Sequence, residues 1–280
     1  MLLNSPPKNM NRPHAPVVSI ITPTLNSSRF LCRTLQSVAD QSYPNIEHII
    51  VDGGSTDGTL DILKQSQAKW ISEPDNGMYD AINKGMRMAT GSILAYLNSD
   101  DLYFHDSVQR VVDFFERHPD ADLVYSNLLY IDESGESLFV RKFPPFSWRL
   151  FTVLDGSTLP QQTSFWRKRV METAGYFDSS FTMAGDFEFL VRVGRTQKIC
   201  KLAGAPLAAF RFHEEMQTLN RKRITDAEIE RIHRMYGFTP SLRTRTLKLA
   251  ATLRYKMWNI HRVKDKMATL LSGTKPKYRP

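Results

Sequence analysis

The sequence contains little cysteine and no long apolar run. Only two of its 280 residues are cysteines, Cys32 and Cys200, and they lie too far apart to suggest a metal site. We therefore expect a reducing, cytoplasmic environment. The apolar stretch 93–97 is far shorter than the roughly 18–20 residues that span a bilayer, so we expect no transmembrane helix. Residues 1–15 lack the apolar core of a signal peptide, and we predict a flexible N-terminal segment.

Charge is distributed unevenly along the chain. The formal net charge is +8, from 37 Lys and Arg against 29 Asp and Glu. Residues 221–280 hold 16 basic and 4 acidic residues, a net +12, which leaves 21 basic and 25 acidic residues, a net −4, in the first 220. This asymmetry favours a polyanionic partner for the C-terminal region, either an anionic membrane face or nucleic acid. We therefore predict a domain over 16–220 and a basic helical region over 221–280.

Apolar β-branched runs alternate with helical spacing of apolar residues, which predicts an α/β fold with a mostly parallel sheet between helices. Strands are predicted at 17–22, 46–51, 69–72, 92–97, 122–130, 198–202 and 207–212. Helices are predicted at 30–38, 59–63, 78–88, 106–117, 167–173 and 187–193. Residues 143–156 are irregular and predict a covering loop. An apolar stripe from Leu249 to Leu270, surrounded by Lys and Arg, predicts an amphipathic helix.

Polar loops follow each of the first four predicted strands, at 22–26, 52–57, 73–77 and 98–101. In an open parallel sheet, ligands bind outside the carboxyl ends of the strands. The four loops are therefore expected to meet at one edge of the sheet and to form a binding site there.

Two of these loops contain the strongest candidates for ligand contacts. Asp100 and Asp101 are adjacent carboxylates at the end of a buried strand, which a hard cation such as Mg²⁺ or Mn²⁺ would stabilise. A helix N-cap is the alternative role for this pair. Asp52 opens a glycine-rich loop in which Ser55 or Asp57 can cap the next helix, and we expect this capping to leave Asp52 free for a base or sugar hydroxyl.

Six segments in this order resemble family 2 glycosyltransferases with the GT-A (Rossmann-like) fold, over residues 16–213. The segments are ITPTLN at 21–26, VDGGSTDGT at 51–59, SEPDNGMYDAINKG at 72–85, LNSDD at 97–101, PQQTSF at 160–165 and AGDFEFL at 184–190.

The resemblance implies a nucleotide-sugar site, with Asp52 facing the base. Its expected donor-binding residues are Thr22, Pro23, Thr24, Asn26, Asp52, Gly54, Asp75, Asp80, Asn83, Lys84, Asn98 and Asp100. A divalent metal, Mn²⁺ or Mg²⁺, is expected at Asp100, Asp101 and His213. Asn98 stands where the family signature begins with a carboxylate, and Ile82 stands where many relatives have an arginine; both departures affect donor or metal contacts.

The resemblance also implies that Asp186 is the catalytic base. An inverting transfer needs a carboxylate that takes the proton of the attacking acceptor hydroxyl. Glu188 is the competing carboxylate, and an N-cap is the alternative role for Asp186. Gln161 and Gln162 are the expected contacts to acceptor hydroxyls, with surface amides as the alternative.

These features predict a metal-dependent inverting glycosyltransferase that moves a sugar, with a UDP-sugar as the favoured donor, to a lipid-linked glycan or polysaccharide. The alternatives are a catalytically inactive donor-binding relative, a sugar nucleotidyltransferase, and a nucleic-acid-binding protein acting through its basic tail. Nucleic acid is the less favoured partner. The basic helix either lies on the inner face of the cytoplasmic membrane or packs on the domain.

Overall fold

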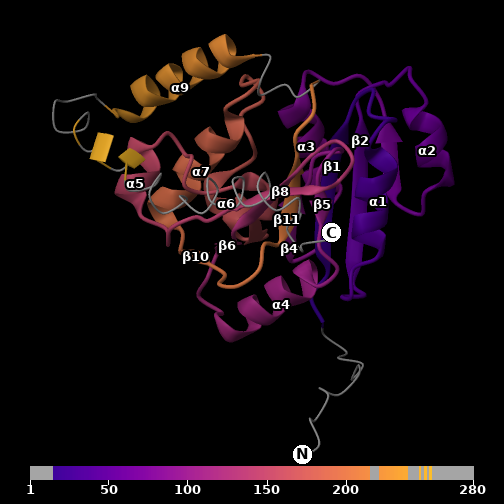
Figure 1. The fold of residues 1–280 in the computed structure, drawn as a ribbon, viewed down its shortest axis with the longest axis horizontal. Coiled ribbons are helices and arrows are strands. Elements are labelled where there is room, and N and C mark those ends of the chain that lie inside the picture. The colour runs from indigo at the N-terminus through magenta and orange to yellow at the C-terminus, as the bar shows by residue number, and fades with distance from the viewer. Residues whose placement is uncertain (1–14, 215–220, 239–245, 247–248, 251, 254–280) are drawn as a thin grey trace, which may run out of the picture.

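A seven-stranded sheet forms the centre of the protein in a computed structural model that describes residues 15–214, 221–238, 246, 249–250 and 252–253 (Figure 1). The strand order is β10-β6-β9-β4-β1-β2-β3. Only β9 runs antiparallel to its neighbours, so the predicted mostly parallel sheet is confirmed. The strands are β1 (Val18–Thr24), β2 (Ile46–Asp52), β3 (Lys69–Ser72), β4 (Ile93–Tyr96), β6 (Leu123–Tyr125), β9 (Phe165–Arg167) and β10 (Ile199–Lys201).

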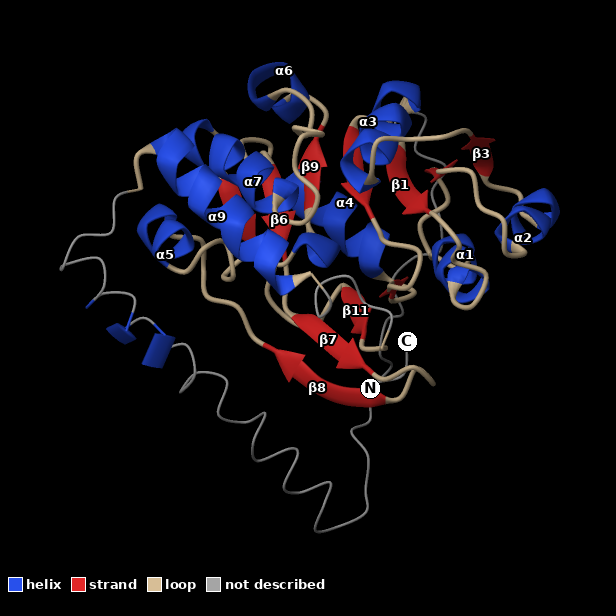
Figure 2. Cartoon of the chain, turned by 90° about the horizontal axis from the view of Figure 1, so that it is seen from above, coloured by secondary structure: helices blue, strands red, loops and turns tan. Residues whose placement is uncertain are grey.

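Helices cover both faces of this sheet. All seven residues of β1 are buried, as expected for a central strand with helices on each side. The helices α1 and α2 lie on one side of the sheet and α3 on the other (Figure 2). The helices are α1 (Leu31–Ala39), α2 (Thr59–Gln65), α3 (Met78–Met88), α4 (Ser107–Arg117), α5 (Trp148–Val153), α6 (Val170–Ala174), α7 (Gly185–Thr196) and α9 (Lys222–Tyr236).

Close packing of α3 on the sheet explains a glycine in the middle of that helix. A Cβ atom on Gly85 would lie 2.5 Å from a side-chain carbon of Ile21 in β1. Glycine weakens a helix interior, but here it lets the helix approach the strand closely. This contact fixes the N-terminal end of α3 near the carboxyl ends of the central strands.

A second sheet, of order β5-β11-β7-β8, lies beside the first. Its strands are β5 (Leu102–Tyr103), β7 (Leu128–Ile131), β8 (Ser137–Arg141) and β11 (Ala208–Arg211). The single strand predicted at 122–130 is therefore wrong: it divides into β6 and β7, which belong to different sheets. Ser126 causes the break, since its N–H donates to Thr163 Oγ1 and its hydroxyl accepts from the N–H of Leu207, in place of ladder bonds.

Two further predictions need correction in this half of the chain. The loop predicted at 143–156 contains α5, whose N-cap Ser147 accepts a hydrogen bond from the N–H of Leu150. The helix predicted from residue 167 begins at Val170, because Phe165, Trp166 and Arg167 instead form strand β9.

Helix α9 lies inside the predicted helical region 221–280, and it packs on the domain that precedes it. Ile232 of α9 is fully buried, and Ile229, Tyr236 and Phe238 pack against the main core. Almost all of the predicted basic helix over 249–270 lies outside the described residues, as does most of the segment 1–15. Among the helices that the structure describes, none has the length and hydropathy needed to cross a membrane.

Candidate active site

The four polar loops meet at one edge of the large sheet, as predicted. The strands β1, β2, β3 and β4 are parallel, so their carboxyl ends lie together. Hydrogen bonds join the loops in sequence. The N–H of Gly53 donates to the carbonyl oxygen of Thr24 at 2.9 Å, and the N–H of Glu73 donates to that of Asp52 at 3.0 Å. The Ser99 hydroxyl donates to the Ser27 hydroxyl at 2.9 Å.

Asp52 organises the glycine-rich loop from a fully buried position. Its Oδ2 accepts from the N–H of Gly54 at 3.0 Å, the N–H of Ser55 at 2.9 Å and the hydroxyl of Ser72 at 2.7 Å. Its Oδ1 accepts from the hydroxyl of Ser55. The expectation that capping leaves this carboxylate free is therefore wrong. The exposed residues of the loop are instead Gly54, Thr56, Asp57 and Gly58. The φ of +90° at Gly54 favours glycine.

The loop after β1 is locked to the glycine-rich loop through Asn26. Asn26 adopts a left-handed conformation, with φ of +49°, and its side-chain oxygen accepts from the N–H of Thr56 at 2.9 Å. Thr22, Pro23 and Thr24 are buried. The Thr22 hydroxyl bonds the His48 ring at 3.0 Å, and burial lowers the pKa of His48 to about 3, so this ring is neutral. Asn26, Thr22, Pro23 and Thr24 thus form the part of the candidate site that follows β1.

Two predicted donor residues, Asp75 and Asp80, lie at the start of α3. A Cβ on Gly53 would lie 2.5 Å from Asp75 Oδ2, so the second and third loops are in close contact. Asp80 accepts from the N–H of Asn76 at 3.1 Å. Lys84 donates to the carbonyl oxygen of Pro74 at 2.9 Å and pairs with Glu73 at 2.9 Å, a hydrogen bond that raises the pKa of Lys84.

Asn83, a predicted donor residue, makes contacts inside the fold. Its side chain is buried, its amide nitrogen donates to the carbonyl oxygen of Phe177 at 2.8 Å, and its amide oxygen accepts from the N–H of Phe177 at 3.0 Å. Both amide groups are therefore used to hold the segment before α7. A contact between Asn83 and the donor stays a prediction.

The acidic pair after β4 divides between two environments. The Asp100 carboxylate is 30% exposed and lies 2.9 Å from His213 Nε2. Asp101 is fully buried, and it accepts from the N–H of Arg211 at 3.1 Å and from the Asn98 amide at 3.4 Å. Burial, together with neighbouring Asp100, raises the pKa of Asp101 well above its usual range.

This division bears on the predicted metal site. Within the described part of the chain, no three or more His, Cys, Asp or Glu side chains are grouped to hold a metal ion. Asp101 is directed into the fold, and its role as a third ligand beside Asp100 and His213 stays a prediction. Asp100 and His213 nevertheless fit a cation that takes its other ligands from a diphosphate, because carboxylate and imidazole are suitable donors for Mn²⁺ and few protein ligands are then needed.

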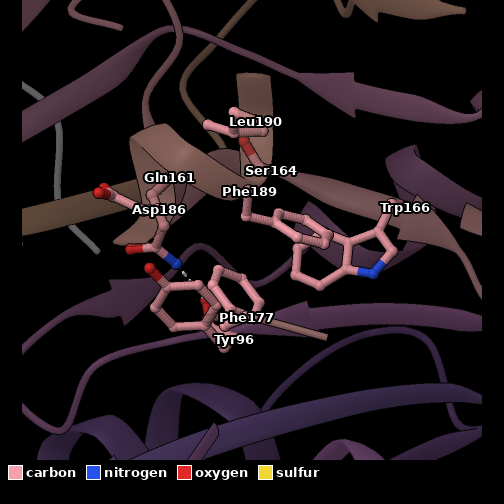
Figure 3. A pocket seen from close by; sticks show the side chains of 8 residues that line it. All are labelled: Tyr96, Gln161, Ser164, Trp166, Phe177, Asp186, Phe189 and Leu190. Carbon is pink, nitrogen blue, oxygen red and sulfur yellow. Dashed lines mark hydrogen bonds between the residues drawn. The ribbon is translucent and has the colours of Figure 1, made fainter. Parts of the chain in front are cut away.

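Asp186 lies in the first turn of α7 and lines a small pocket (Figure 3). Its Oδ1 accepts from the N–H of Phe187 at 2.8 Å and from the Tyr79 hydroxyl at 3.4 Å. Tyr79 also accepts from the N–H of Asp186 at 3.1 Å. The pocket, of about 10 Å³, has room for about one water molecule. Its lining residues are Tyr96, Gln161, Ser164, Trp166, Phe177, Asp186, Phe189 and Leu190.

The environment of Asp186 shifts the pKa of its carboxyl group upward. Burial raises the pKa of Asp186 above its usual value, hydrogen bonds from Phe187 and Tyr79 oppose this rise, and the charge of Glu228 adds to it. A raised carboxyl pKa is typical of a group that accepts a proton during catalysis.

Tyr96 connects the Asp186 pocket to the acidic loop. It is the last residue of β4, two positions before Asn98, and its ring lines the pocket. Its pKa is raised by burial and by the charges of both Asp186 and Asp101. The pocket therefore lies at the same sheet edge as Asp100 and His213.

The predicted acceptor residues are largely structural. Gln161, in a short 3₁₀ turn, is buried and donates to the carbonyl oxygen of Tyr96 at 2.7 Å. Glu188 is buried and pairs with Arg192 at 2.8 Å, while the Tyr236 hydroxyl donates to it. Both side chains therefore have partners within the fold, and their acceptor roles stay predictions. Gln162 is partly exposed and stays a candidate.

Sequence reasoning missed three residues that shape the site. Tyr79 contacts Asp186, Glu228 binds the segment before α7, and Arg211 donates through Nε to the carbonyl oxygen of Asp100 at 3.0 Å. Only Tyr79 carried a usable signal, since it lies inside the matched segment 72–85. Glu228 and Arg211 act through the three-dimensional contacts of the folded chain, which no local pattern indicated.

The fold and this edge of the sheet define a glycosyltransferase with the GT-A fold. A family model described as Glycosyl transferase family 2 matches residues 19–175, which is more than half of the chain. The protein therefore belongs to glycosyl transferase family 2, as the sequence resemblance predicted.

Curated relatives include two glycosyltransferases of Mycobacterium tuberculosis. One, a PGL/p-HBAD biosynthesis glycosyltransferase, is 33% identical over 189 residues, covering 64% of this chain and 70% of the relative. The other, an uncharacterized glycosyltransferase, is 36% identical over 187 residues, covering 64% and 69%. The chain also matches 28% of chondroitin synthase from Escherichia coli at 26% identity, covering 66% of this chain.

Solved structures share the fold at low identity. S. aureus TarS 1–349 in complex with UDP-GlcNAc has a TM-score of 0.61 and 19% identity, covering 85% of this chain and 80% of that chain. The match covers 43% of the longer S. aureus TarS chain. Mannosyltransferase PcManGT from Pyrobaculum calidifontis, in complex with GDP-Man and Mn²⁺, has a TM-score of 0.57 and 16% identity, covering 89% and 85%.

Proposed function

We propose that this protein is an inverting glycosyltransferase that uses a nucleotide-sugar, with a UDP-sugar as the favoured donor. The acceptor is a hydroxyl group of a lipid-linked glycan or polysaccharide. The observation that carries the proposal is the position of Asp186: its carboxylate lines a pocket at the end of β4, next to the loop that bears Asp100. Three relatives support the choice of donor and acceptor class: the PGL/p-HBAD biosynthesis glycosyltransferase, chondroitin synthase and the TarS complex with UDP-GlcNAc.

In this proposal the loops after β1, β2 and β3 bind the nucleotide. Gly54 and Asn26 are exposed at this edge of the sheet, and the buried Asp52 stabilises the loop that contains Gly54. Asp100 and His213 would hold a divalent cation, Mn²⁺ or Mg²⁺, which offsets the charge that develops on the leaving diphosphate. The proposed contact with the inner face of the cytoplasmic membrane would place the enzyme beside a lipid-linked acceptor.

Asp186 would act as the base. The acceptor oxygen attacks the anomeric carbon from the face opposite the nucleoside diphosphate, the bond from that carbon to the leaving oxygen breaks, and the hydroxyl proton moves to Asp186 Oδ2. Tyr79 and the N–H of Phe187 bind Oδ1 and thereby orient the carboxylate. General-base catalysis of this kind contributes about 10²- to 10⁴-fold to the rate.

The test is nucleoside diphosphate release by purified protein from a panel of nucleotide-sugars with Mn²⁺ and candidate acceptors. We expect Asp186→Asn to lower kcat by about 10²- to 10⁴-fold while the KM for the donor changes little. Glu172→Gln, at an exposed carboxylate of α6, is the matched control and should retain full turnover. Wild-type turnover in Asp186→Asn would exclude it as the base, and Mn²⁺-dependent donor binding without turnover would favour an inactive relative.

A further inference from the structure

The carboxylate of Glu228 in α9 binds three consecutive backbone N–H groups just before α7. Its Oε1 accepts from Thr182 at 2.7 Å, and its Oε2 accepts from Met183 at 2.9 Å and from Ala184 at 2.8 Å. Hydrogen bonds to an ionised acceptor are about twice as strong as neutral ones. Glu228 therefore fixes the segment 182–184 two residues before Asp186.

The opposite side of the same segment is held by Tyr79 of α3. A Cβ on Gly185 would lie 2.7 to 2.9 Å from three carbons of the buried Tyr79 ring, so backbone and ring are in tight contact. The Tyr79 hydroxyl accepts from the N–H of Asp186, and its single proton is shared between the carbonyl oxygen of Met183 at 3.2 Å and Asp186 Oδ1 at 3.4 Å. The segment that leads into Asp186 is thus enclosed between α9 and α3.

The helix that carries Glu228 is itself firmly anchored. It lies alongside α7 in both ribbon views (Figures 1 and 2). Ile232 is fully buried, and the Arg231 guanidinium lies 4.2 Å from the centroid of the Phe181 ring and donates to the Ser180 hydroxyl at 2.7 Å. The Tyr236 hydroxyl donates to Glu188 of α7. Glu228 therefore reaches the segment from a fixed position.

We propose that Glu228 is a positioning residue for Asp186, which sets the place of the catalytic carboxylate by binding the N–H groups of 182–184. This inference rests on the proposed function, in which Asp186 is the base. It gives α9 a part in the active site, although this helix contributes no side chain to the pocket around Asp186.

The charge of Glu228 gives the proposal a signature that a purely structural contact lacks. The groups that face Asp186 are Tyr79 from α3, Tyr96 from β4 and Glu228 from α9. Of these, Glu228 carries a negative charge that raises the pKa of Asp186. Neutralising it should lower that pKa, so the acid limb of the kcat/KM profile should move to lower pH.

The experiment compares Glu228→Gln and Glu228→Asp with a matched control, Glu230→Gln. Glu230 is on the same helix, is 75% exposed and pairs only weakly with Arg234 at 4.0 Å. For Glu228→Gln we expect kcat to fall by about 10- to 100-fold, because a shift of about 1 Å at a reacting group costs about that much. The donor KM should stay unchanged, and backbone amides 182–184 should exchange hydrogen for deuterium faster.

The two other variants separate charge from placement. Glu228→Asp keeps the charge but is one methylene shorter, so we expect faster amide exchange and lower kcat with the acid limb near its wild-type pH. If Glu228→Gln fails to fold, amide exchange and kcat of Glu228→Asp test the positioning role. Glu230→Gln should match the wild type in all measurements.

Two results would overturn the proposal. In the first, Glu228→Gln has the same amide exchange rates, the same kcat and the same acid limb of the kcat/KM profile as Glu230→Gln. In the second, the backbone amides of Glu228→Gln exchange faster but its kcat and the acid limb of its kcat/KM profile are unchanged. Glu228 would then be a structural residue only. Asp186→Asn is measured in parallel: wild-type turnover there removes the base itself and with it this role of Glu228. Loss of turnover in Asp186→Asn beside an unaffected Glu228→Gln removes only the positioning role.

Discussion

Replacing Tyr79 with phenylalanine tests whether its hydroxyl holds Asp186 in place. The change removes one oxygen that bonds the N–H of Asp186 at 3.1 Å, the carbonyl oxygen of Met183 at 3.2 Å and Asp186 Oδ1 at 3.4 Å. Leaving such partners unsatisfied costs about 1–3 kcal/mol. At about 2–4 °C per kcal/mol for a chain of this size, the Tm should fall by about 2–12 °C.

The same change should shift the pH dependence of catalysis. The Tyr79 hydrogen bond lowers the pKa of Asp186, so its loss should raise that pKa further. A base must be deprotonated to act, and the acid limb of kcat/KM should therefore move to higher pH. This shift is opposite in sign to the one expected for Glu228→Gln, so the two variants together test the electrostatics of the pocket.

Tyr103→Phe provides a matched control for Tyr79→Phe. Tyr103 is also a buried tyrosine, but its hydroxyl has no hydrogen-bond partner among the residues that the structure describes. Its removal should leave the Tm unchanged or raise it. Thermal melting and the pH profile of nucleoside diphosphate release measure both effects. Equal Tm values and equal acid limbs in the two variants would refute the role assigned to the Tyr79 hydroxyl.

Two further predictions concern the buried Glu188 and the proposed metal site. Glu188→Gln breaks the 2.8 Å pair with Arg192 and should cost at most about 3–5 kcal/mol of stability in chemical denaturation; a large fall in kcat with unchanged stability would contradict this. Asp100→Asn should raise the Mn²⁺ concentration for half-maximal activity by at least about tenfold, since it removes a ligand. Asp101→Asn should leave that concentration unchanged, and an equal rise in both variants would restore Asp101 as a ligand.

Much of the sheet could be predicted from the sequence, because its central strands are continuous apolar runs. The strand at 69–72 and the helix at 78–88 have the predicted bounds, and β1, β2 and β4 lie within two residues of theirs. The polar loops after these strands had to meet, since parallel strands place their carboxyl ends at one edge. The convergence of the site thus followed from periodicity and topology alone.

The second sheet could not be predicted in the same way. Its strand β5 has only two residues and pairs with β11, which lies far away in the chain. Strand β9 of the first sheet is also short, and it pairs with the distant strands β4 and β6. The break between β6 and β7 depends on Ser126, whose side chain bonds Leu207, 81 residues later. Such bonds compete with ladder pairing only after the chain has folded, so no local pattern reveals them.

The roles of individual carboxylates and amides were harder to predict because the same residue types build loops and bind ligands. Asp52 and Glu188 are buried, and both are compensated by several donors from their own surroundings. Burying a charge is costly unless donors or a partner satisfy it, and this requirement favours Asp and Glu in such structural positions. The Asp100 carboxylate is 30% exposed and lies beside His213. Exposure and remaining hydrogen-bonding capacity therefore separate the two kinds of residue.

The match to the family model covers only part of the candidate active site. It ends at residue 175, so it covers the donor loops and Asp100, while Asp186, His213 and Glu228 lie beyond it. The contacts that place Asp186 come from both parts: Tyr79 lies within the matched region, and Glu228 lies in a helix outside it. If Glu228 sets the base, the acceptor side of this enzyme depends on a helix that the shared donor-binding region does not specify. Truncation before α9 should then abolish transfer even where donor binding survives.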